Sequence, residues 1–395
     1  MEKITYPIKH SKDAILYTIS QFFERAAYYG IRALVVIYMT DLSLNMENEN
    51  ALEVYGWLAF SLIPLNLVGA LIGDLIIGHK KTLIIGNLFQ ILGCLALCIE
   101  SKTGFFIGLG SMAIGSGIYS PNIKAAYGKQ YLDKKQLLYG AFTLFYMLVN
   151  LGAFVGIMLI GRIGEEFSYI FGFLVGAVFS ILSLIMIFLT SGLKTSSEEE
   201  NFTMSKRFSV IAITIVIVGL FWSIYGFTAN SITEIQMLVS NSIPEISWTM
   251  FQSVNAVSII AFGIIFTIIW SMYYNNAYIK LGAGFILAGI GLALLMVEIS
   301  SIYNLVPALI FIAFAEILIA PVIQSIIVRY TRPKYLATIF AIATIPPMLF
   351  NKLVNLSSET LYGKETSFFL STGTVAMLLA GIVVLVIRKI NSQKA

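Results

Sequence analysis

The stretch SQFFERAAYYGIRALVVIY at residues 20–38 contains three ionisable side chains, Glu24, Arg25 and Arg32, in a segment otherwise apolar enough to cross a membrane. An unpaired charge near the bilayer centre costs at least about 2.5 to 3.5 kcal/mol, so three charges facing lipid are implausible. At about 100° per residue, the polar residues of the stretch fall within an arc of about 140° on one side of a helix. They are Gln21, Glu24, Arg25, Tyr28, Tyr29 and Arg32. This side is therefore predicted to line a water-filled cavity. The alternative, a structural Glu24–Arg25 pair, accounts less well for Arg32 and the tyrosines.

The rest of the chain repeats the apolar pattern of this segment. Of the 395 residues, 58% are hydrophobic and 12% are charged, and the apolar residues form blocks of about 20 separated by short polar links. This composition excludes a soluble protein and predicts an all-α polytopic membrane protein with twelve spans. The spans are expected at 13–39, 53–77, 81–100, 104–127, 138–162, 168–191, 208–230, 248–272, 280–300, 304–329, 335–357 and 366–388.

Most lysines and arginines lie in alternate links and at the termini. They are Lys3, Lys9, Lys12, Lys80, Lys81, Lys134, Lys135, Lys206, Arg207, Lys280, Arg332, Lys334, Arg388 and Lys389. The positive-inside rule then puts both termini in the cytoplasm, which agrees with an even number of spans. We expect a multi-pass protein of the inner (plasma) membrane. The net charge of +4 describes this topology and argues little for nucleic-acid binding.

The link LKTSSEEENFTMSKR at 193–207 divides the spans into two groups of six. The sequence thus predicts an N-terminal six-helix half at 1–192, a cytoplasmic linker at 193–207 and a C-terminal six-helix half at 208–395. Two such halves favour a transporter with its site between them near the bilayer midplane. Pro121 and Pro321 fall inside predicted spans, where helix bends often gate a pathway.

The sequence offers little for catalysis or metal binding. It contains no GxxxxGK[ST] nucleotide-binding motif, and the only histidines are His10 and His79. Cys94 and Cys98 lie one turn apart in one span, which is poor geometry for a disulfide and too little for a metal site. We therefore expect packing roles for the cysteines, no cofactor other than a coupling proton, and no enzymatic activity.

FFERAAYYGIR at 22–32 resembles the ExxER..YYG signature on the first helix of the proton-dependent oligopeptide transporter family, a branch of the major facilitator superfamily. Four further stretches resemble motifs of that family in the same order. They are GALIGDLIIGHKKTLIIG at 69–86, GSGIYSPNIKAAYGKQY at 115–131, FYMLVNLGAFVG at 145–156 and FQSVNAVSII at 251–260. The resemblance implies the superfamily fold, with twelve transmembrane helices in two six-helix halves. It also implies that Asp74 serves an inter-helix latch.

The chain departs from the family pattern at three charged positions. The first acidic position of ExxER is Gln21, the fourth-helix lysine is Ser120, and the seventh-helix acidic position is Gly226. The tenth helix keeps its carboxylate as Glu316 in FAEILIAPV at 314–322. The resemblance implies charge pairs between the two halves, and each pair has lost one partner here.

The charges that remain in the predicted cavity suit a zwitterion, because Glu24 and Glu316 balance Arg25 and Arg32. A substrate carboxylate is expected at Arg32, which can bind it bidentately, and an ammonium group at Glu316. Further substrate contacts are expected from Gln21, Tyr28, Tyr29, Ser120, Asn150, Trp222, Tyr225, Gln252 and Asn255.

Proton coupling is expected to depend on Glu24, Arg25 and Glu316. Gln21 cannot titrate, and Glu24 should stay ionised beside Arg25. Glu316, with apolar sequence neighbours, is the expected proton carrier. The alternative is that coupling is altered or lost.

These features predict a secondary active transporter that imports di- or tripeptides or similar zwitterions by alternating access, with proton symport as the family default. One alternative keeps the fold and changes the cargo to amino acids, peptide-like metabolites or drugs, with altered or no proton coupling. A second is a non-transporting membrane receptor. The expected partners are a small zwitterionic substrate and the lipid bilayer, with no nucleic acid, and a monomer suffices.

Overall fold

A computed structural model describes residues 2–3, 10–41, 44–192, 202–243, 245, 248–274, 276–298, 301–356 and 366–393. Nearly all of these residues are helical. The first half contains α1 (Lys12–Thr40), α2 (Asn48–Leu71), α3 (His79–Leu97), α4 (Lys102–Lys129), α5 (Leu138–Glu166) and α6 (Tyr169–Phe188). The second contains α7 (Met204–Ser242), α8 (Trp248–Met272), α9 (Ala277–Val297), α10 (Ile302–Tyr330), α11 (Leu336–Ala343), α12 (Ile345–Leu356) and α14 (Thr366–Gln393).

Short elements join the helices. A π-helical segment, η1 (Ile72–Ile76), ends α2, and single 3-10 turns, η2 (Lys135–Leu137) and η3 (Pro333–Tyr335), precede α5 and α11. The strands β1 (Glu2–Lys3) and β2 (Tyr273–Tyr274) pair antiparallel, with Glu2 opposite Tyr274.

The described helices confirm an all-α polytopic membrane protein. Ten described segments are long and apolar enough to cross a membrane. Helices α1 and α4, with 29 and 28 residues, have the length but not the apolar composition, because α1 contains the charged stripe and α4 is rich in glycine. Together with these two helices, the spans in the described residues number twelve.

Several predicted boundaries were wrong. Helix α7 begins at Met204 and ends at Ser242, whereas the span was expected at 208–230. The eleventh span was expected as one helix, but α11 ends at Ala343 and α12 begins at Ile345. The break precedes Pro346 and Pro347, whose missing N–H groups and rings disfavour a continuous helix. Pro121 and Pro321, in contrast, lie inside the continuous helices α4 and α10.

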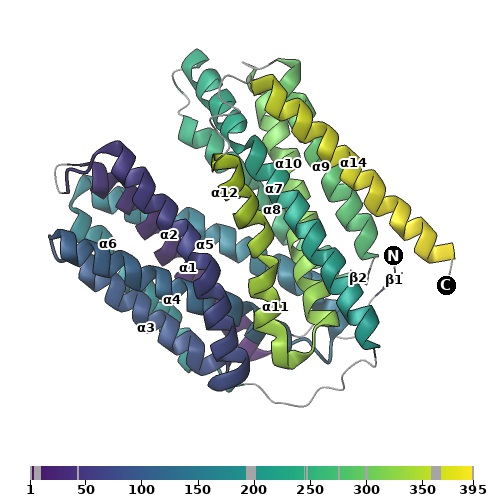
Figure 1. The fold of residues 1–395 in the computed structure, drawn as a ribbon, viewed down its shortest axis with the longest axis horizontal. Helices are drawn as coiled ribbons and strands as arrows, with labels where there is room; N and C mark the ends of the chain where they lie inside the picture. Colours follow the sequence, from purple (N-terminus) through teal and green to yellow (C-terminus); the bar gives the residue numbers. More distant parts are fainter. Residues whose placement is uncertain are drawn as a thin grey trace.

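The helices form two groups that follow the chain (Figure 1). Helices α1 to α6 gather on one side and α7 to α14 on the other. The groups approach each other at the end where α6 ends and α7 begins, and they diverge towards the opposite end. We call the first of these the linker end. Helices α5 and α8 make the most extensive contact between the halves, and α11 packs on α2 and α4.

Glycines set the close approach of helices in the first half. A Cβ on Gly86 would lie 2.9 Å from the carbonyl oxygen of Gly115, and a Cβ on Gly108 would lie 2.9 Å from that of Gly93. Helices α3 and α4 therefore touch through their backbones. A Cβ on Gly156 of α5 would overlap the carbonyl of Ala26 in the same way, so the charged helix α1 is held tightly against α5.

Candidate functional site

The charged stripe of α1 is buried inside the N-terminal half. Glu24 is fully buried and pairs with Arg25, whose Nε donates to Glu24 Oε2 at 2.5 Å and whose Nη2 donates to Oε1 at 2.7 Å. Gln90 of α3 donates to Glu24 Oε1 at 2.9 Å, and Arg25 Nη2 also donates to Ser116 of α4 at 3.1 Å. A buried pair needs such additional hydrogen bonds to offset its desolvation. The structure therefore shows the structural Glu24–Arg25 pair, which the sequence had left open as the alternative to a stripe that lines a cavity.

Aromatic rings surround the two arginines of α1. The guanidinium carbon of Arg25 lies 5.1 Å from the ring centroid of Tyr28 and 5.7 Å from that of Tyr29. Arg32 lies over the ring of Tyr55 on α2 at 4.6 Å. These cation–π contacts explain why tyrosines accompany the arginines.

Lys124 is a member of this cluster that the sequence analysis missed. It lies on α4, four residues after Ser120, and therefore on the same helix face one turn further on. The charges of Glu24 and Arg25 both act on its ammonium group. The spacing from Ser120 was a signal that could have identified it. With Lys124, the cluster of Glu24, Arg25 and Arg32 has two more positive than negative charges.

A second group of predicted residues meets around a cavity of about 330 Å³. Five predicted residues line it, from α5, α7, α8 and α10: Asn150, Trp222, Tyr225, Asn255 and Glu316. Thr233 and Gln236 of α7 also line it and were not predicted. The wall thus combines amide groups, aromatic rings and one carboxylate.

Glu316 joins the two halves through hydrogen bonds. Its side chain is buried, Tyr146 Oη of α5 donates to Oε2 at 2.6 Å, and Asn255 Nδ2 of α8 donates to Oε1 at 2.8 Å. Asn150 Nδ2 donates to the backbone carbonyl of Tyr146 at 2.9 Å. Tyr146 was missed because tyrosine in an apolar span is usually a packing residue, and only its contact with Glu316 distinguishes it.

The other predicted residues whose side chains the structure describes are not among those that line this cavity. Arg32, expected to bind the substrate carboxylate, is not among the residues that line it and instead contacts Tyr55. Gln21 is buried, and its Oε1 has no hydrogen-bond partner among the described residues. Ser120 is half-buried on α4. The side chain of Gln252 lies outside the described residues. Pro121 and Pro321 are buried.

Asp74 forms a contact between the halves at the linker end. Its carboxylate accepts from the backbone N–H groups of Ala337 at 3.2 Å and Thr338 at 2.7 Å, and from the Thr338 hydroxyl at 2.8 Å. These donors belong to the first turn of α11, where unsatisfied N–H groups and the helix dipole favour an anion. The resemblance implied an inter-helix latch at Asp74, and the structure places its carboxylate on α11 of the opposite half.

A histidine network orients the segment that contains Asp74. Lys129 Nζ lies 2.6 Å from His79 Nε2, so this nitrogen accepts and the opposite Nδ1–H donates to Asn122 Oδ1 at 2.8 Å. Asn122 Nδ2 in turn donates to the Gly69 carbonyl at 2.7 Å. The network ties α2, α3 and α4 together directly behind the contact with α11.

We expect Asp74→Asn to lower the free energy of unfolding by about 1 to 2 kcal/mol, because the amide loses the charge that the α11 N-terminus favours. Thermal denaturation in detergent measures the change. Asp133→Asn removes an equivalent charge from an exposed position and should change stability by less than about 0.5 kcal/mol. Equal effects of the two substitutions would contradict the latch.

Comparisons with known proteins agree with this architecture. Residues 80–219 match the family model for the POT family. "Dipeptide and tripeptide permease B" of Photorhabdus luminescens is 29% identical over 204 residues, which cover 50% of this chain and 42% of that protein. "Uncharacterized transporter YclF" of Bacillus subtilis (strain 168) is 28% identical over 189 residues, covering 46% and 38%. The matched region thus spans less than half the length of these relatives.

Solved structures resemble the chain over nearly its full length. A POT family transporter in complex with a thioalcohol-conjugated peptide has a TM-score of 0.67 at 20% identity, covering 95% of this chain and 96% of that one. A bacterial homologue of the human drug peptide transporters PepT1 and PepT2 has a TM-score of 0.66 at 18% identity, covering 97% and 99%. At these identities the likeness concerns the fold.

The relatives are named as permeases and transporters, which supports the prediction that the chain is not an enzyme. The order of the sequence motifs, the family match and the fold agree with one another. Residues 80–219 of the chain match the POT family, and the described helices have the fold of solved POT family transporters.

Proposed function

We propose that this protein imports di- or tripeptides or similar zwitterions by alternating access between its two halves. The observation that carries the proposal is the separation of charge across the molecule. Among the described residues that line the cavity, Glu316 is the one carboxylate and none is cationic. The cluster on α1 and α4 has an excess of positive charge from Arg25, Arg32 and Lys124. A zwitterion placed between them satisfies both ends.

The cavity wall suits a short peptide. Asn150, Asn255 and Gln236 supply amide groups that can donate to and accept from a peptide bond. Trp222 and Tyr225 supply aromatic surface for a side chain. A relative is named a dipeptide and tripeptide permease, and related structures are described in complex with a conjugated peptide and with 5-aminolevulinic acid. These names support the same class of cargo for this chain.

Within this proposal, Lys124 joins Arg32 as a partner for the substrate carboxylate. Arg25 is already paired with Glu24, and Arg32 is stacked on Tyr55. Lys124 makes no ion pair among the described residues, and its flexible stem suits a point-charge contact. This assignment would restore a lysine to the helix face from which Ser120 removes one.

We propose that Glu316 is the coupling site for protons. Its two donors, Tyr146 and Asn255, come from opposite halves, so separation of the halves changes the stabilisation of its carboxylate. Gln21 and Gly226 occupy positions that are acidic in the family pattern and cannot titrate here. Glu316 is therefore the carboxylate that remains for proton coupling. The inner membrane and cytoplasmic termini follow from the distribution of lysine and arginine and form part of the proposal.

Uptake of labelled dipeptides into proteoliposomes, with and without an inward proton gradient, tests this function. We expect gradient-driven accumulation in the wild type and at least a tenfold loss in Glu316→Gln, with exchange of peptide across the membrane retained. Glu165→Gln changes an exposed glutamate and should accumulate peptide normally. Normal accumulation by Glu316→Gln would refute the proton route. Absence of peptide movement under every condition would refute peptide transport and favour another cargo.

A further inference from the structure

Lys280 is a buried cation that the site described above does not use. From its sequence position Lys280 was expected in a cytoplasmic link, but it lies inside the first turn of α9 and is only 3% exposed. Its Nζ has no hydrogen-bond partner among the described residues. Lysine is almost never fully buried unless it is paired. Its position therefore requires a physical explanation.

Two aromatic rings face the Lys280 ammonium group. Nζ lies 3.8 Å from the ring centroid of Tyr139 and 4.3 Å from that of Trp270. Trp270 belongs to α8 and therefore to the same half as Lys280, whereas Tyr139 begins α5 in the opposite half. The Tyr139 contact consequently exists only while the halves are together at the linker end.

The contact between α5 and α8 is tight next to Tyr139. A Cβ on Gly140 would lie 2.9 Å from the backbone nitrogen of Ser271. The hydroxyl groups of Thr267 and Ser271 are buried there without a hydrogen-bond partner among the described residues. Two hydroxyls and one ammonium group thus lose water where the halves meet.

Magnitudes decide whether Lys280 favours or opposes this closed arrangement. A desolvated cation–π contact favours association by about 30-fold, which is about 2 kcal/mol at 1.4 kcal/mol per tenfold. Burial of one ion opposes it by at least about 100-fold. The penalty for desolvating the ammonium group therefore exceeds the stabilisation that its contact with the Tyr139 ring provides. The Trp270 ring contributes in both arrangements, because it stays with Lys280.

Water can reach Lys280 once Tyr139 withdraws. Tyr139 and Leu281, the sequence neighbour of Lys280, both line a cavity of about 420 Å³. Lys135 and Arg329 line the same cavity, so its polar wall is compatible with hydration. Opening of the linker end would therefore relieve the desolvation of the ammonium group.

We propose that Lys280 destabilises the closed linker end and thereby sets how readily the protein opens there, with Tyr139 limiting the penalty. The inference rests on the alternating-access function proposed above and assigns a residue to its reorientation step. The proposed role differs from a simple latch in the direction in which the Lys280 substitution shifts the equilibrium between the closed and open linker end. A latch weakens when either partner is removed, whereas here Lys280 and Tyr139 act in opposite directions.

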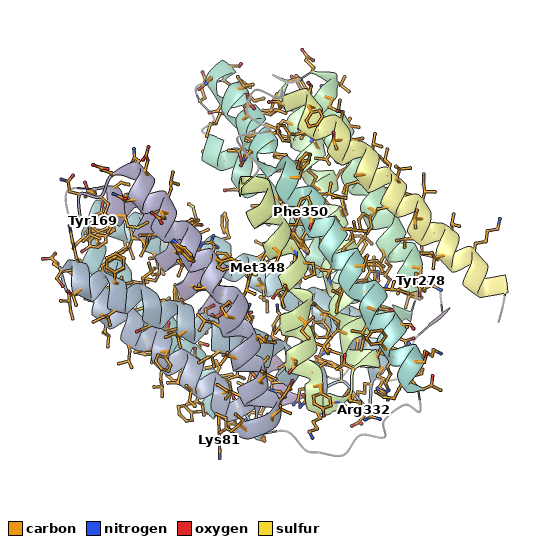
Figure 2. The ribbon with its side chains drawn as sticks, in the orientation of Figure 1. Lys81, Tyr169, Tyr278, Arg332, Met348 and Phe350 are labelled. Carbon is orange, nitrogen blue, oxygen red and sulfur yellow. The ribbon has the colours of Figure 1, made fainter. Side chains whose placement is uncertain are left out.

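Distances between spin labels at the linker end test whether Lys280 stabilises or destabilises the closed arrangement, and they need no transport measurement. Lys81 and Arg332 are exposed and lie at this end on opposite halves (Figure 2). Cysteines placed there, in a background with Cys94 and Cys98 replaced by alanine, report the separation of the halves by pulsed electron paramagnetic resonance. The measurement uses purified protein in nanodiscs and no substrate. Its result can therefore be interpreted even if the protein does not transport peptides.

We expect Lys280→Met to reduce the long-distance population at least threefold and Tyr139→Leu to increase it at least threefold. Tyr139→Phe keeps the ring and should match the wild type. Trp270→Leu should shift the distribution less than Tyr139→Leu, because that ring stays with Lys280. Lys334→Met removes an exposed lysine of the same half and should have no effect. An increase of the long-distance population in Lys280→Met would show a latch and overturn the proposal, as would an unchanged distribution.

Discussion

Glu24→Ala is expected to lower the free energy of unfolding by about 3 to 5 kcal/mol, because it leaves the guanidinium of Arg25 buried without its counter-ion. Arg25 is 9% exposed and directs two hydrogen bonds to the lost carboxylate. Gln90 of α3 loses its acceptor as well. Thermal denaturation of the purified protein in detergent measures the loss.

The matched control removes both charges. Replacing Glu24 and Arg25 together by methionine fills a similar volume without a buried ion, and such replacements are often neutral or stabilising. The double variant should therefore be more stable than Glu24→Ala. A double variant less stable than the single one would mean that the pair contributes more than its desolvation costs.

Gly156→Ala is expected to destabilise the protein by about 1 to 3 kcal/mol through overpacking. The added Cβ would overlap the backbone of Ala26, and a helix backbone cannot move aside as a side chain can. Helices α1 and α5 would have to separate, which also disturbs the charged stripe. The midpoint of thermal unfolding should fall, and the peptide uptake described above should fall with it.

Gly161→Ala on the same helix provides the control. A Cβ at Gly161 has no atom within 4 Å, so the substitution should stabilise the helix by up to about 1 kcal/mol through propensity alone. Opposite signs for the same chemical change, five residues apart, are the expected result. A destabilising Gly161→Ala would indicate that the effect comes from the helix and not from its contact with α1.

The sequence was sufficient for features that depend on local periodicity. Blocks of apolar residues located the spans. The arc of polar residues on α1 was expected to line a water-filled cavity, and the structure instead buries Glu24 and Arg25 within the N-terminal half. Motif order pointed to Asp74 at a contact between helices and to Glu316 as a buried carboxylate. The spans and the polar arc follow from composition and from the 3.6-residue repeat, whereas Asp74 and Glu316 were implied by the resemblance to the family motifs.

Features that depend on which helices meet could not be predicted in this way. Tyr146 and Glu316 are 170 positions apart, and no local pattern connects them. Lys280 was counted among the loop lysines because it lies near the end of an apolar block, and only the fold shows the rings around it. The separation of Arg32 from the Glu316 cavity likewise depends on how the two halves are placed.

The backbone contacts between α3 and α4 limit how far the N-terminal half can deform. Where a glycine of one helix meets a carbonyl group of the other, no side chain lies between the two backbones, so sliding at these points is restricted. The N-terminal half should therefore deform little within itself, and its amide protons along these two helices should exchange slowly with solvent. In the proposed alternating-access cycle, movement is therefore expected at the surfaces between the halves, where large side chains and unsatisfied polar groups meet.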